Sequence, residues 1–431
     1  MSSELFPLSP SLWADTAVPP VATPPLDSSC NADVAIIGAG YAGLSTAFHL
    51  AKAGVNVVVL EAREPGWGGS GRNGGQVIAG LKYDPDELEA KFGGDAGRAV
   101  ATFAGSTTDQ VFNLIASENL SVPHVRKGWV QGAHNDEVMK TVEARVRQWQ
   151  RRGVEGARLL DKSGVAELLG TQAYKGGWLD PRGGGLQPQS YARELARIAL
   201  AAGAKIFGQT VVTGWQHQGA SWKVATAKGP AVTAKTVIVC TNAYTRELSQ
   251  QLASTVITPN TYQVATVPLT WAQSDSVMPG GQVSSDTRNL LLYFRRDHTG
   301  RLIMGGRGPF RQPTSKSDWA HLERIVPRMF PQLEGISFDH HWCGHVAVTR
   351  DFLPHVHEPE PGLLINIGCQ GRGVALETSM GAALARYQIT RDPRVLPFPL
   401  TKLSPIPFHG LQQLYLAAAV TWYRMRDAGL L

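Results

Sequence analysis

The chain has 431 residues, of which 43% are hydrophobic and 18% are charged, and its formal net charge is +6. This length predicts roughly two to three domains, and the composition is that of a soluble globular protein. Lysine and arginine are spread along the chain without a dense basic block, which argues against a nucleic-acid partner. Apolar stretches are too short to span a bilayer, and the start lacks the pattern of a secretion signal. We therefore expect a cytoplasmic protein without stable membrane insertion.

In chain order, residues 1–30 are rich in Pro and Ser and predict an extended arm. Residues 32–63, "ADVAIIGAGYAGLSTAFHLAKAGVNVVVLEAR", predict a strand, a glycine turn, an amphipathic helix and a second strand, which together form a βαβ unit. A glycine-rich loop, "EPGWGGSGRNGGQ", follows at 64–76. A helical pattern then covers 85–119.

The middle of the chain predicts a strand within 125–135 and a helix over 136–153. Residues 176–207 predict a loop, then a helix with Ser190 near its start, then a strand. Residues 221–245 predict a short hairpin that leads into an apolar parallel strand, Thr236 to Thr241. From about 255 to 345 the alternating pattern predicts an antiparallel sheet.

The last part of the chain again shows the pattern of a strand, a glycine turn and a helix. Residues 362–389, "GLLINIGCQGRGVALETSMGAALARYQI", predict a strand, a glycine-rich turn and a helix. The C-terminal residues 411–431 predict an amphipathic helix packed on the body of the protein.

These elements predict an α/β protein in which a discontinuous, Rossmann-like nucleotide-binding domain contains an inserted α+β domain built on an antiparallel sheet. The predicted nucleotide-binding domain comprises 31–82, 158–248 and 344–400, and the inserted substrate domain comprises 83–157 and 249–343. The N-terminal arm, 1–30, and the C-terminal helix, 401–431, lie outside these two domains.

The βαβ unit contains a complete nucleotide-binding fingerprint, GxGxxG, at residues 38–43. Gly38 permits a tight turn, Gly40 lets a pyrophosphate approach the backbone, and Gly43 allows close packing of helix on strand. Glu61, at the end of the second strand, can bond both hydroxyls of a ribose and disfavours a 2′-phosphate. The unit therefore predicts NAD or FAD rather than NADP.

Two glycine-rich segments favour FAD. The second strand leads directly into the loop at 64–76, whose glycines suit the close approach of a flat tricyclic ring, with Ser70, Arg72, Asn73 and Gln76 as polar contacts. The second turn, at 368–377, opens the last helix, whose N-terminus can stabilise negative charge on a reduced flavin.

The chain resembles the glycine/D-amino-acid oxidase superfamily of FAD enzymes, and "GWGGSGRNGGQ" is similar to its γ-glutamylputrescine oxidase-like branch of amine oxidases. Matching segments include "RGGGLQP" at 182–188, "TVVTGW" at 210–215, "TVIVCTNAYT" at 236–245, "YFRRDHTGRLIMGG" at 293–306 and "GCQGRGVALETSMG" at 368–381. With the residues above, the resemblance predicts these cofactor-binding residues: Gly38, Gly40, Tyr41, Ala42, Gly43, Glu61, Ala62, Arg63, Gly69, Ser70, Arg72, Asn73, Gly74, Gly75, Gln76, Val212, Thr241, Asn242, Gly371, Arg372, Gly373 and Val374.

The resemblance implies that FAD lies between two domains and oxidises a C–N bond of an amine or amino acid to an imine, which water hydrolyses. Electrons would pass to O2, giving H2O2, or to another acceptor. The implied substrate is an amine that carries a carboxylate, such as a γ-glutamyl-amine, sarcosine or iminodiacetate. A flavin dehydrogenase that reduces a quinone or a partner protein, and a non-catalytic nucleotide-binding protein, are the alternatives.

Hydride transfer from a neutral amine needs no nucleophile, metal or pair of carboxylates, so positioning and exclusion of water are expected to dominate. The substrate-side candidates are Tyr262, Tyr293, Arg295 and His345. On a strand, Tyr293 and Arg295 share one face, from which Arg295 could bind a substrate carboxylate. Alternatively, Arg295 lines a solvated strand and His345 is a hydrogen-bonded structural histidine.

Cysteine and histidine spacing predicts neither a metal site nor a redox motif. The cysteines are far apart, form no CxxC pair, and are expected to be free thiols: Cys30, Cys240, Cys343 and Cys369. His340 and His341 point to opposite faces of an alternating strand. Some relatives attach FAD through a cysteine near this strand, but Cys343 is out of register, so we expect non-covalent FAD.

Overall fold

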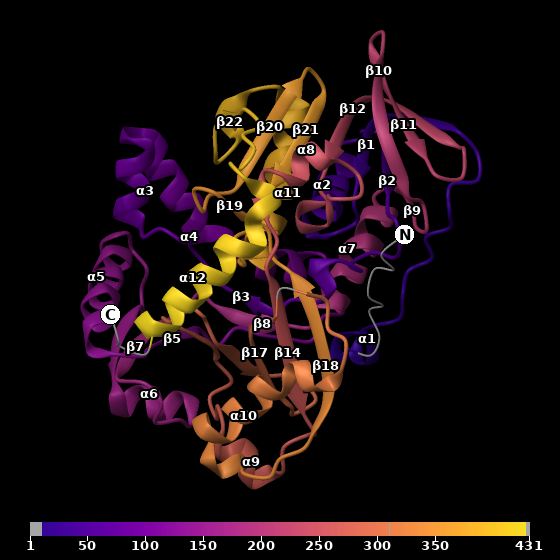
Figure 1. Cartoon of the computed structure of the whole chain (residues 1–431). Coiled ribbons are helices and arrows are strands. Elements are labelled where there is room, and N and C mark those ends of the chain that lie inside the picture. The colour runs from indigo at the N-terminus through magenta and orange to yellow at the C-terminus, as the bar shows by residue number, and fades with distance from the viewer. Residues whose placement is uncertain (1–10, 310, 428–431) are drawn as a thin grey trace.

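The computed structural model describes residues 11–309 and 311–427 of the chain, and two large sheets dominate this part of it (Figure 1). The first sheet, at the top of Figure 1, has strand order β22-β20-β21-β12-β1-β2-β9, with the β10–β11 hairpin paired to β12. Its strands are β1 (Cys30–Ile37), β2 (Val57–Leu60), β9 (Lys205–Phe207), β10 (Val212–Gln218), β11 (Ser221–Thr226), β12 (Ala231–Val239), β20 (His355–Glu360), β21 (Leu363–Ile367) and β22 (Leu400–Thr401).

The centre of the first sheet is parallel and buried on both faces. Strands β21, β12, β1, β2 and β9 run parallel to their neighbours. Along β2, Val57 and Val59 pack into the helical layer while Val58 and Leu60 pack beneath the β10–β11 hairpin. Alternate side chains of a strand point to opposite faces, so a continuous apolar run supplies hydrophobic side chains to the clusters on both faces of the sheet.

Four helices form the layer that covers one face of this sheet, where they share a single hydrophobic cluster with β1 and β2. They are α2 (Tyr41–Lys52), α4 (Gly94–Ser117), α7 (Pro188–Ala201) and α11 (Gly373–Thr390). The predicted βαβ unit, the helix over 85–119, the helix with Ser190 near its start and the final strand–turn–helix unit are all confirmed. The first helical stretch is divided, because α3 (Pro85–Phe92) ends before α4 begins.

The second sheet, at the bottom of Figure 1, has strand order β18-β14-β17-β16-β15-β5-β7-β6. Its strands are β5 (Trp129–Ala133), β6 (Arg158–Asp161), β7 (Gly176–Asp180), β14 (Asn260–Thr266), β15 (Val283–Asp286), β16 (Tyr293–Arg296), β17 (Leu302–Arg307) and β18 (Phe338–His345). The antiparallel sheet predicted for 255–345 is confirmed, and β15 extends it by pairing in parallel with β5.

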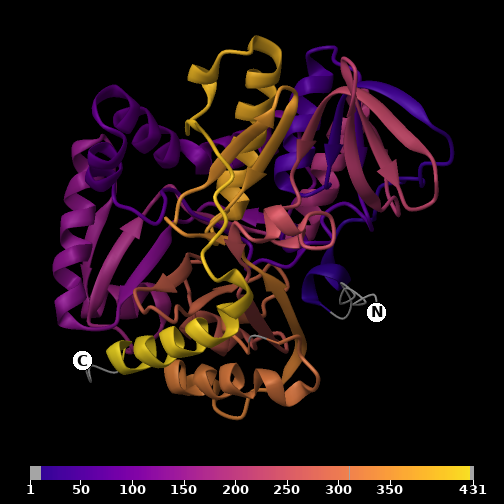
Figure 2. The same ribbon diagram turned by 45° about the horizontal axis from the view of Figure 1, so that its top comes forward.

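Helices cover one face of the second sheet and its far edge. Helices α6 (Lys162–Leu169) and α10 (Ala320–Met329) contribute to the cluster beneath β14, β16 and β17. Helix α5 (Asp136–Arg151) packs against β5 and β7 through a separate cluster that contains three tryptophans. Figure 2 shows α5 and the β10–β11 hairpin on opposite sides of the molecule.

The loop predicted after residue 176 is wrong for its first five residues, which form β7. The glycines of this segment suggested a loop, but the neighbouring strand requires them. A Cβ at Gly177 would lie 2.3 Å from the carbonyl oxygen of Gln131 on β5. Close packing therefore overrides the low strand propensity of glycine here.

The predicted domain boundaries do not follow the sheets throughout. Strands β6 and β7, within 158–180, pair with β5 in the second sheet, although the sequence assigned 158–248 to the nucleotide-binding domain. Helix α4, which the sequence assigned to the substrate domain, packs against α2 and α11 of the first. We therefore propose that α4 belongs to the first unit and 158–180 to the second, since each segment shares its core with that unit.

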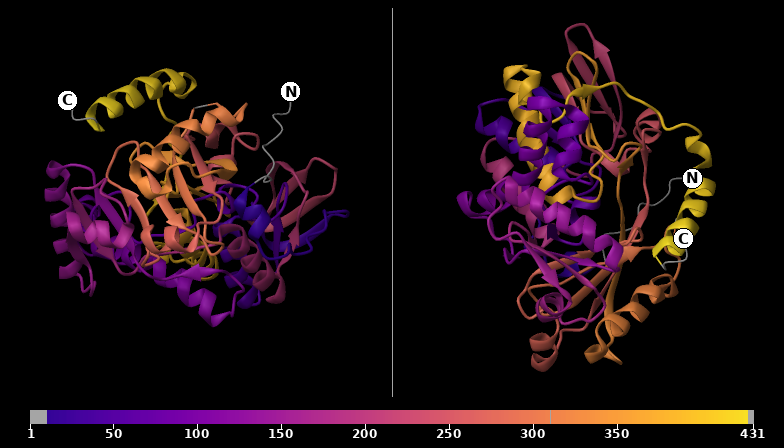
Figure 3. Two further views of the ribbon diagram at one scale, coloured as in Figure 1. Left: turned by 90° about the horizontal axis from the view of Figure 1, so that it is seen from below. Right: turned by 90° about the vertical axis from the view of Figure 1, so that its left-hand side faces the viewer.

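The two ends of the described chain differ in how they contact the rest of the protein. The arm predicted over 1–30 contains a short helix, α1 (Leu12–Thr16), whose Leu12 and Trp13 are fully buried against β14, β17 and β18. The predicted C-terminal helix is present as α12 (Gln412–Asp427), which crosses outside both sheets (Figures 1 and 3). Among the described helices, none is long and apolar enough to cross a membrane.

Candidate active site

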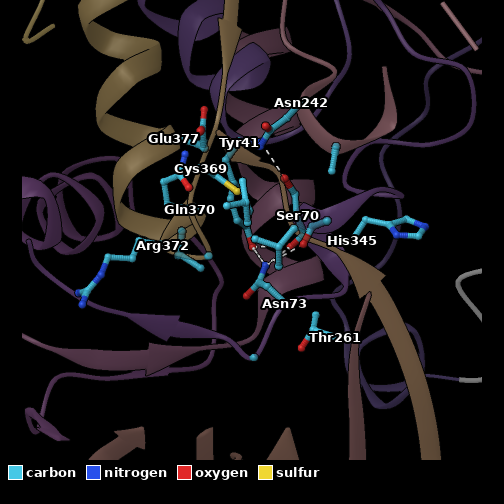
Figure 4. Close-up of a pocket in the computed structure, with 18 of the residues that line it drawn as sticks. Tyr41, Ser70, Asn73, Asn242, Thr261, His345, Cys369, Gln370, Arg372 and Glu377 are labelled. Atoms are coloured by element: carbon cyan, nitrogen blue, oxygen red, sulfur yellow. Dashed lines mark hydrogen bonds between the residues drawn. The ribbon is translucent and has the colours of Figure 1, made fainter. Parts of the chain in front are cut away.

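One large cavity is lined by residues of both sheets and of the segments that join them (Figure 4). Its volume is about 1070 Å3. Pockets for one small molecule occupy roughly 300–1,000 Å3. The cavity therefore has the size expected for a large cofactor with a smaller molecule beside it.

The first end of the cavity is the glycine turn between β1 and α2. Gly38 has a φ of +103°, which favours glycine, and a Cβ at Gly43 would lie only 2.0 Å from the Gly38 carbonyl oxygen. These glycines bring the N-terminus of α2 against β1, and Gly38, Ala39, Gly40 and Tyr41 line the cavity there. Such a helix N-terminus stabilises phosphate groups.

Glu61 lies on the cavity wall directly after β2. Its Oε2 accepts a hydrogen bond from the Ala39 N–H at 2.8 Å, and its Oε1 accepts one from the Arg63 N–H at 2.9 Å. Burial raises the pKa of Glu61, while these two backbone donors lower it. Each oxygen keeps a second lone pair for a ribose hydroxyl.

The glycine-rich loop has two sides, and several of its glycines face protein rather than the cavity. A Cβ at Gly71 would lie 2.0 Å from Gln189 Oε1, and one at Gly74 would lie 2.7 Å from the Tyr293 ring. Because these positions have no room for a side chain, the glycine density serves packing against α7 and β16 as well as the cavity wall.

A hydrogen-bond network fixes the cavity side of this loop (Figure 4). The Tyr41 hydroxyl donates to the Ser70 carbonyl oxygen at 2.5 Å, and Asn73 Nδ2 donates to the same oxygen at 2.7 Å. Ser70 Oγ accepts from the Tyr41 N–H at 3.1 Å. Tyr41, Ser70 and Asn73 thus hold the loop against the start of α2 and form one wall of the cavity.

Two arginines expected at the ligand lie behind this loop. Arg72 is 4% exposed, with its guanidinium over the Trp67 ring at 4.2 Å and its Nε donating to the Trp67 carbonyl oxygen at 2.9 Å. Arg295 donates from Nε to Gly74 O at 2.8 Å and from Nη2 to Leu186 O at 2.6 Å. Burial lowers the pKa of Arg295 to about 10. Neither residue lines the cavity, so Arg295 is not placed to bind a substrate carboxylate.

Of the other three substrate-side candidates, two line the cavity and one does not. Tyr293 and His345 line the cavity, whereas Tyr262 is fully buried in the core of the second sheet. The Tyr293 hydroxyl lies 2.7 Å from Thr261 Oγ1, another wall residue. Burial, with the nearby charge of Arg72, lowers the pKa of His345 to about 4, so its imidazole is neutral near pH 7.

Most predicted cofactor-binding residues are brought together on the cavity wall: Gly38, Gly40, Tyr41, Glu61, Ala62, Gly69, Ser70, Asn73, Gly74, Gln76, Val212, Thr241, Asn242, Gly371, Arg372, Gly373 and Val374. The remaining ones do not line it: Ala42, Gly43, Arg63, Arg72 and Gly75. Ala42 and Gly43 pack inside the first turn of α2, and Gly75 faces Arg295.

The cavity wall also includes residues that belong to no recognised motif. Some come from the segment after the glycine-rich loop and from β5, α5 and β7: Lys82, Trp129, Gln131, Arg145 and Trp178. Glu377, in α11, and Tyr244 also line the cavity, and both lie within segments that carried the family resemblance. The spacing of Trp129 and Gln131 along the chain carried no signal, because the pairing of β5 with β15 joins their strand to the rest of the second sheet.

The cysteines bear on how a cofactor could be held. Cys343 is 3% exposed and packs in the core of the second sheet, so it does not reach the cavity. Cys369 and Cys240 do line the cavity. No group of three or more His, Cys, Asp or Glu side chains in the described ranges could hold a metal ion.

A parallel βαβ unit with a complete fingerprint, joined by one cavity to an antiparallel sheet, is typical of a dinucleotide-binding protein. The family described as "FAD dependent oxidoreductase" matches residues 33–387, and the chain belongs to this family. The predicted superfamily, fold class and FAD cofactor are therefore confirmed, and the protein is an FAD-dependent oxidoreductase.

Individual relatives cover nearly the whole chain. The γ-glutamylputrescine oxidoreductase of Escherichia coli is 31% identical over 414 residues, which are 93% of this chain and 94% of that protein. A probable oxidoreductase, OrdL, of Haemophilus influenzae is 31% identical and covers 94% of each chain. The crystal structure of glycine oxidase from Geobacillus kaustophilus has the same fold, with a TM-score of 0.73 at 21% identity over 86% of this chain and 99% of that one.

The residues on the wall fit FAD. The turn at Gly38 and Gly40 is a cradle that a Cβ would fill. In the described residues, Thr241 Oγ1 and Gln370 Oε1 are buried side-chain atoms at this cavity without a hydrogen-bond partner. Buried polar atoms are nearly always bonded, so these atoms suit the polar atoms of a bound cofactor.

Proposed function

We propose that this protein oxidises a C–N bond of an amine that carries a carboxylate, giving an imine that water hydrolyses, and that O2 accepts the electrons. The observation that carries this proposal is the single cavity, which begins at the fingerprint turn and reaches Tyr293 and His345 on the second sheet. A molecule as long as FAD, if bound at the turn, would extend toward these residues. The name of the Escherichia coli relative supports an amine as substrate.

Bound FAD would supply a two-electron acceptor. The protein's part is to hold the amine in place and to keep water away, which are large contributions to such a reaction. Tyr293, fixed by Thr261, provides a rigid wall on the second sheet. The His345 imidazole carries no positive charge near neutral pH, so it neither repels a protonated amine nor acts as its acid. We infer that the amine reacts in its neutral form.

The test uses the purified yellow protein and a panel of polyamines, γ-glutamylated amines, D-amino acids and N-substituted glycines. Without oxygen, a substrate should bleach the flavin, and in air the colour should return with release of H2O2. Slow recolouring in air would contradict O2 as acceptor and favour a dehydrogenase that uses a quinone or a partner protein. Failure of the whole panel to bleach the flavin would contradict amine oxidation and favour a non-catalytic nucleotide-binding protein.

A further inference from the structure

One part of the cavity wall, beside α5, is rich in hydrogen-bond donors, and we call it the cationic recess: Lys82, Gln131, Arg145 and Arg372. Lys82 follows the glycine-rich loop, Gln131 lies on β5, Arg145 lies on α5 and Arg372 immediately precedes α11. In Figure 4 the guanidinium of Arg372 points away from Tyr41, Ser70 and Asn73. The recess is therefore separate from the wall that the fingerprint builds.

The charges in the recess do not cancel. Arg145 is paired with Asp84, with Nε and Nη2 lying 2.5 and 3.2 Å from its two carboxylate oxygens. Lys82 and Arg372 have no carboxylate partner in the described part of the chain, and Arg372 instead donates from Nη1 to the Ala79 carbonyl oxygen at 2.7 Å. The recess thus presents to the cavity two cations that form no ion pair with any described residue.

The other charged pairs around this part of the cavity are already matched. Asp286 forms an ion pair with Arg288, and Asp180 forms one with Arg182 at 2.6 Å. These carboxylates are therefore each bonded to another arginine, although the charges of Asp180 and Asp84 still favour the charged form of Arg372. Arg372 is half-buried without an ion-pair partner in the described part of the chain, which favours an anionic ligand here.

Gln131 adds a neutral donor with a fixed orientation. Its Oε1 accepts hydrogen bonds from Arg145 Nη1 at 2.5 Å and from Trp178 Nε1 at 3.0 Å. Two donors on one oxygen set which way the amide faces, so Nε2 carries the free N–H groups. Nε2 donates to no residue in the ranges that the structure describes.

Contacts of Arg372 bring the segments of the recess together: its Nη1 donates to the carbonyl oxygen of Ala79, three residues before Lys82, and its guanidinium lies 5.4 Å from the Trp129 ring on β5. Desolvation, with the charges of Arg372 and Arg145, lowers the pKa of Lys82. Burial, and next the charge of Arg145, lowers the pKa of Arg372 to about 10. Arg372 therefore still carries its charge near neutral pH. A carboxylate bound between Lys82 and Arg372 would relieve the repulsion between these cations.

The register of the second sheet gives the distance from the recess to the reacting end of the substrate. Gln131 pairs with Ser285, and Ser285 pairs with Tyr293, so the three residues form one row across β5, β15 and β16. Neighbouring strands are about 4.8 Å apart, which places Gln131 about 10 Å from Tyr293 along the sheet. An N-substituted glycine, whose carboxylate is one carbon from its nitrogen, is too short for this span.

We propose that the cationic recess binds the carboxylate of the substrate, and that the substrate is therefore a long amine whose carboxylate lies several carbons from the reacting C–N bond. This inference rests on the proposed function, which places the reacting bond beside Tyr293 and His345. It selects the γ-glutamyl-amine type of substrate over sarcosine and iminodiacetate. Lys82 is its most accessible donor, since it is exposed to the cavity.

The test compares ω-aminooctanoate with octylamine, which has the same chain length without the carboxylate, in the FAD-loaded enzyme. Lys82→Met should raise KM for ω-aminooctanoate about tenfold and change KM for octylamine less than about twofold, because only the first contacts the recess. Lys82→Arg should restore most of the affinity. Lys223→Met, on exposed β11, is the matched control and should match the wild type for both amines.

Calorimetric titration with octanoate provides a readout that does not depend on turnover. Wild type and Lys223→Met should bind octanoate alike, and Lys82→Met about tenfold more weakly. Equal binding of octanoate by all three proteins would overturn the proposal that the recess binds a carboxylate, even if amines are oxidised. If no amine reduces the flavin but octanoate binding still depends on Lys82, the proposed function fails while the recess stands as an anion site. An equal rise in KM for both amines in Lys82→Met would also overturn the proposal.

Discussion

Single residues in the glycine-rich loop differ in what they contact, and a pair of substitutions can separate the two roles. A Cβ at Gly71 would lie 2.0 Å from Gln189 Oε1, whereas one at Gly69 meets nothing closer than the His345 carbonyl oxygen at 3.5 Å. We expect Gly71→Ala to reduce the free energy of unfolding by about 1–3 kcal/mol, as overpacking does. Gly69→Ala should change it by less than about 0.5 kcal/mol. Urea unfolding of both variants measures the difference, and equal stability would show that the loop is not packed as described.

Glu377 makes stability depend on pH. Burial raises its pKa from 4.5 to about 7, and its single described partner is Asn366, which donates to Oε2 at 2.5 Å. Between these two pH values the folded protein keeps a proton that the unfolded chain loses. The contribution of Glu377 is therefore complete below about pH 4.5 and is lost as the pH rises to about 7, a change of roughly 3 kcal/mol.

Glu377→Gln should remove this dependence of the free energy of unfolding on pH. Denaturant unfolding at about pH 5 and about pH 7.5 would show a smaller loss of stability in the variant than in the wild type. An unchanged difference between the two pH values would mean that Glu377 is ionised in the folded protein.

His345 should not control the pH dependence of turnover near neutrality. Its pKa of about 4 leaves it neutral there, so kcat/KM should rise with pH along the pKa of the substrate amine. We expect His345→Gln to keep that rise and to lose less than about tenfold in rate, whereas removal of a true acid or base costs about 10²–10⁴-fold. Two amines of different pKa distinguish the cases, because a rise at the same pH for both would implicate a group on the protein.

The contrast between Tyr293 and Arg295 shows what sequence can and cannot predict for single residues. The alternation of β16 correctly places both on one face. It does not reveal that Arg295 donates to two carbonyl oxygens and is covered, since these acceptors come from distant segments. The fingerprint residues were predictable because the turn itself dictates them. Lys82 and Gln131 were not, because only tertiary structure brings them together.

Among the elements, α12 is linked to the cavity wall by Asp427. The Asp427 carboxylate accepts hydrogen bonds from the Asn289 and Leu290 N–H groups, each at 2.9 Å, and these two residues line the cavity. Asp427→Asn should loosen this wall and raise KM roughly fivefold with little loss of global stability, because charge-assisted bonds are the stronger ones. Arg426→Gln, at the neighbouring exposed position, is the control. The same KM in both variants and the wild type would show that α12 does not support the wall.

Elements were predictable where their pattern is local. The βαβ unit, α5 and the last strand–turn–helix unit each carry their own periodicity, and all are present. Strand β7 and helix α1 were missed because distant partners determine them: β7 pairs with β5 and β6, and α1 is five residues long with Trp13 buried against the second sheet. The strand order of the second sheet also depends on pairing between residues far apart in the chain.

At the scale of the whole molecule, the two sheets meet at one cavity, and this arrangement is what the oxidation of an amine by FAD requires. The order of motifs predicted an interrupted α/β fold, because strand–turn–helix segments occur both before and after the segment with the antiparallel pattern. This order could not predict the extent of the cavity, which depends on how β5, β15 and β16 face the glycine-rich loop.

The most direct test of amine oxidation in this cavity is rapid mixing of the FAD-loaded enzyme with ω-aminooctanoate in the absence of oxygen. We predict that the flavin is reduced in one saturable phase, at a rate at least equal to kcat, and that the aldehyde formed after hydrolysis equals the flavin reduced. Reduction slower than kcat, or no reduction by this or any other amine of the panel, would contradict the account.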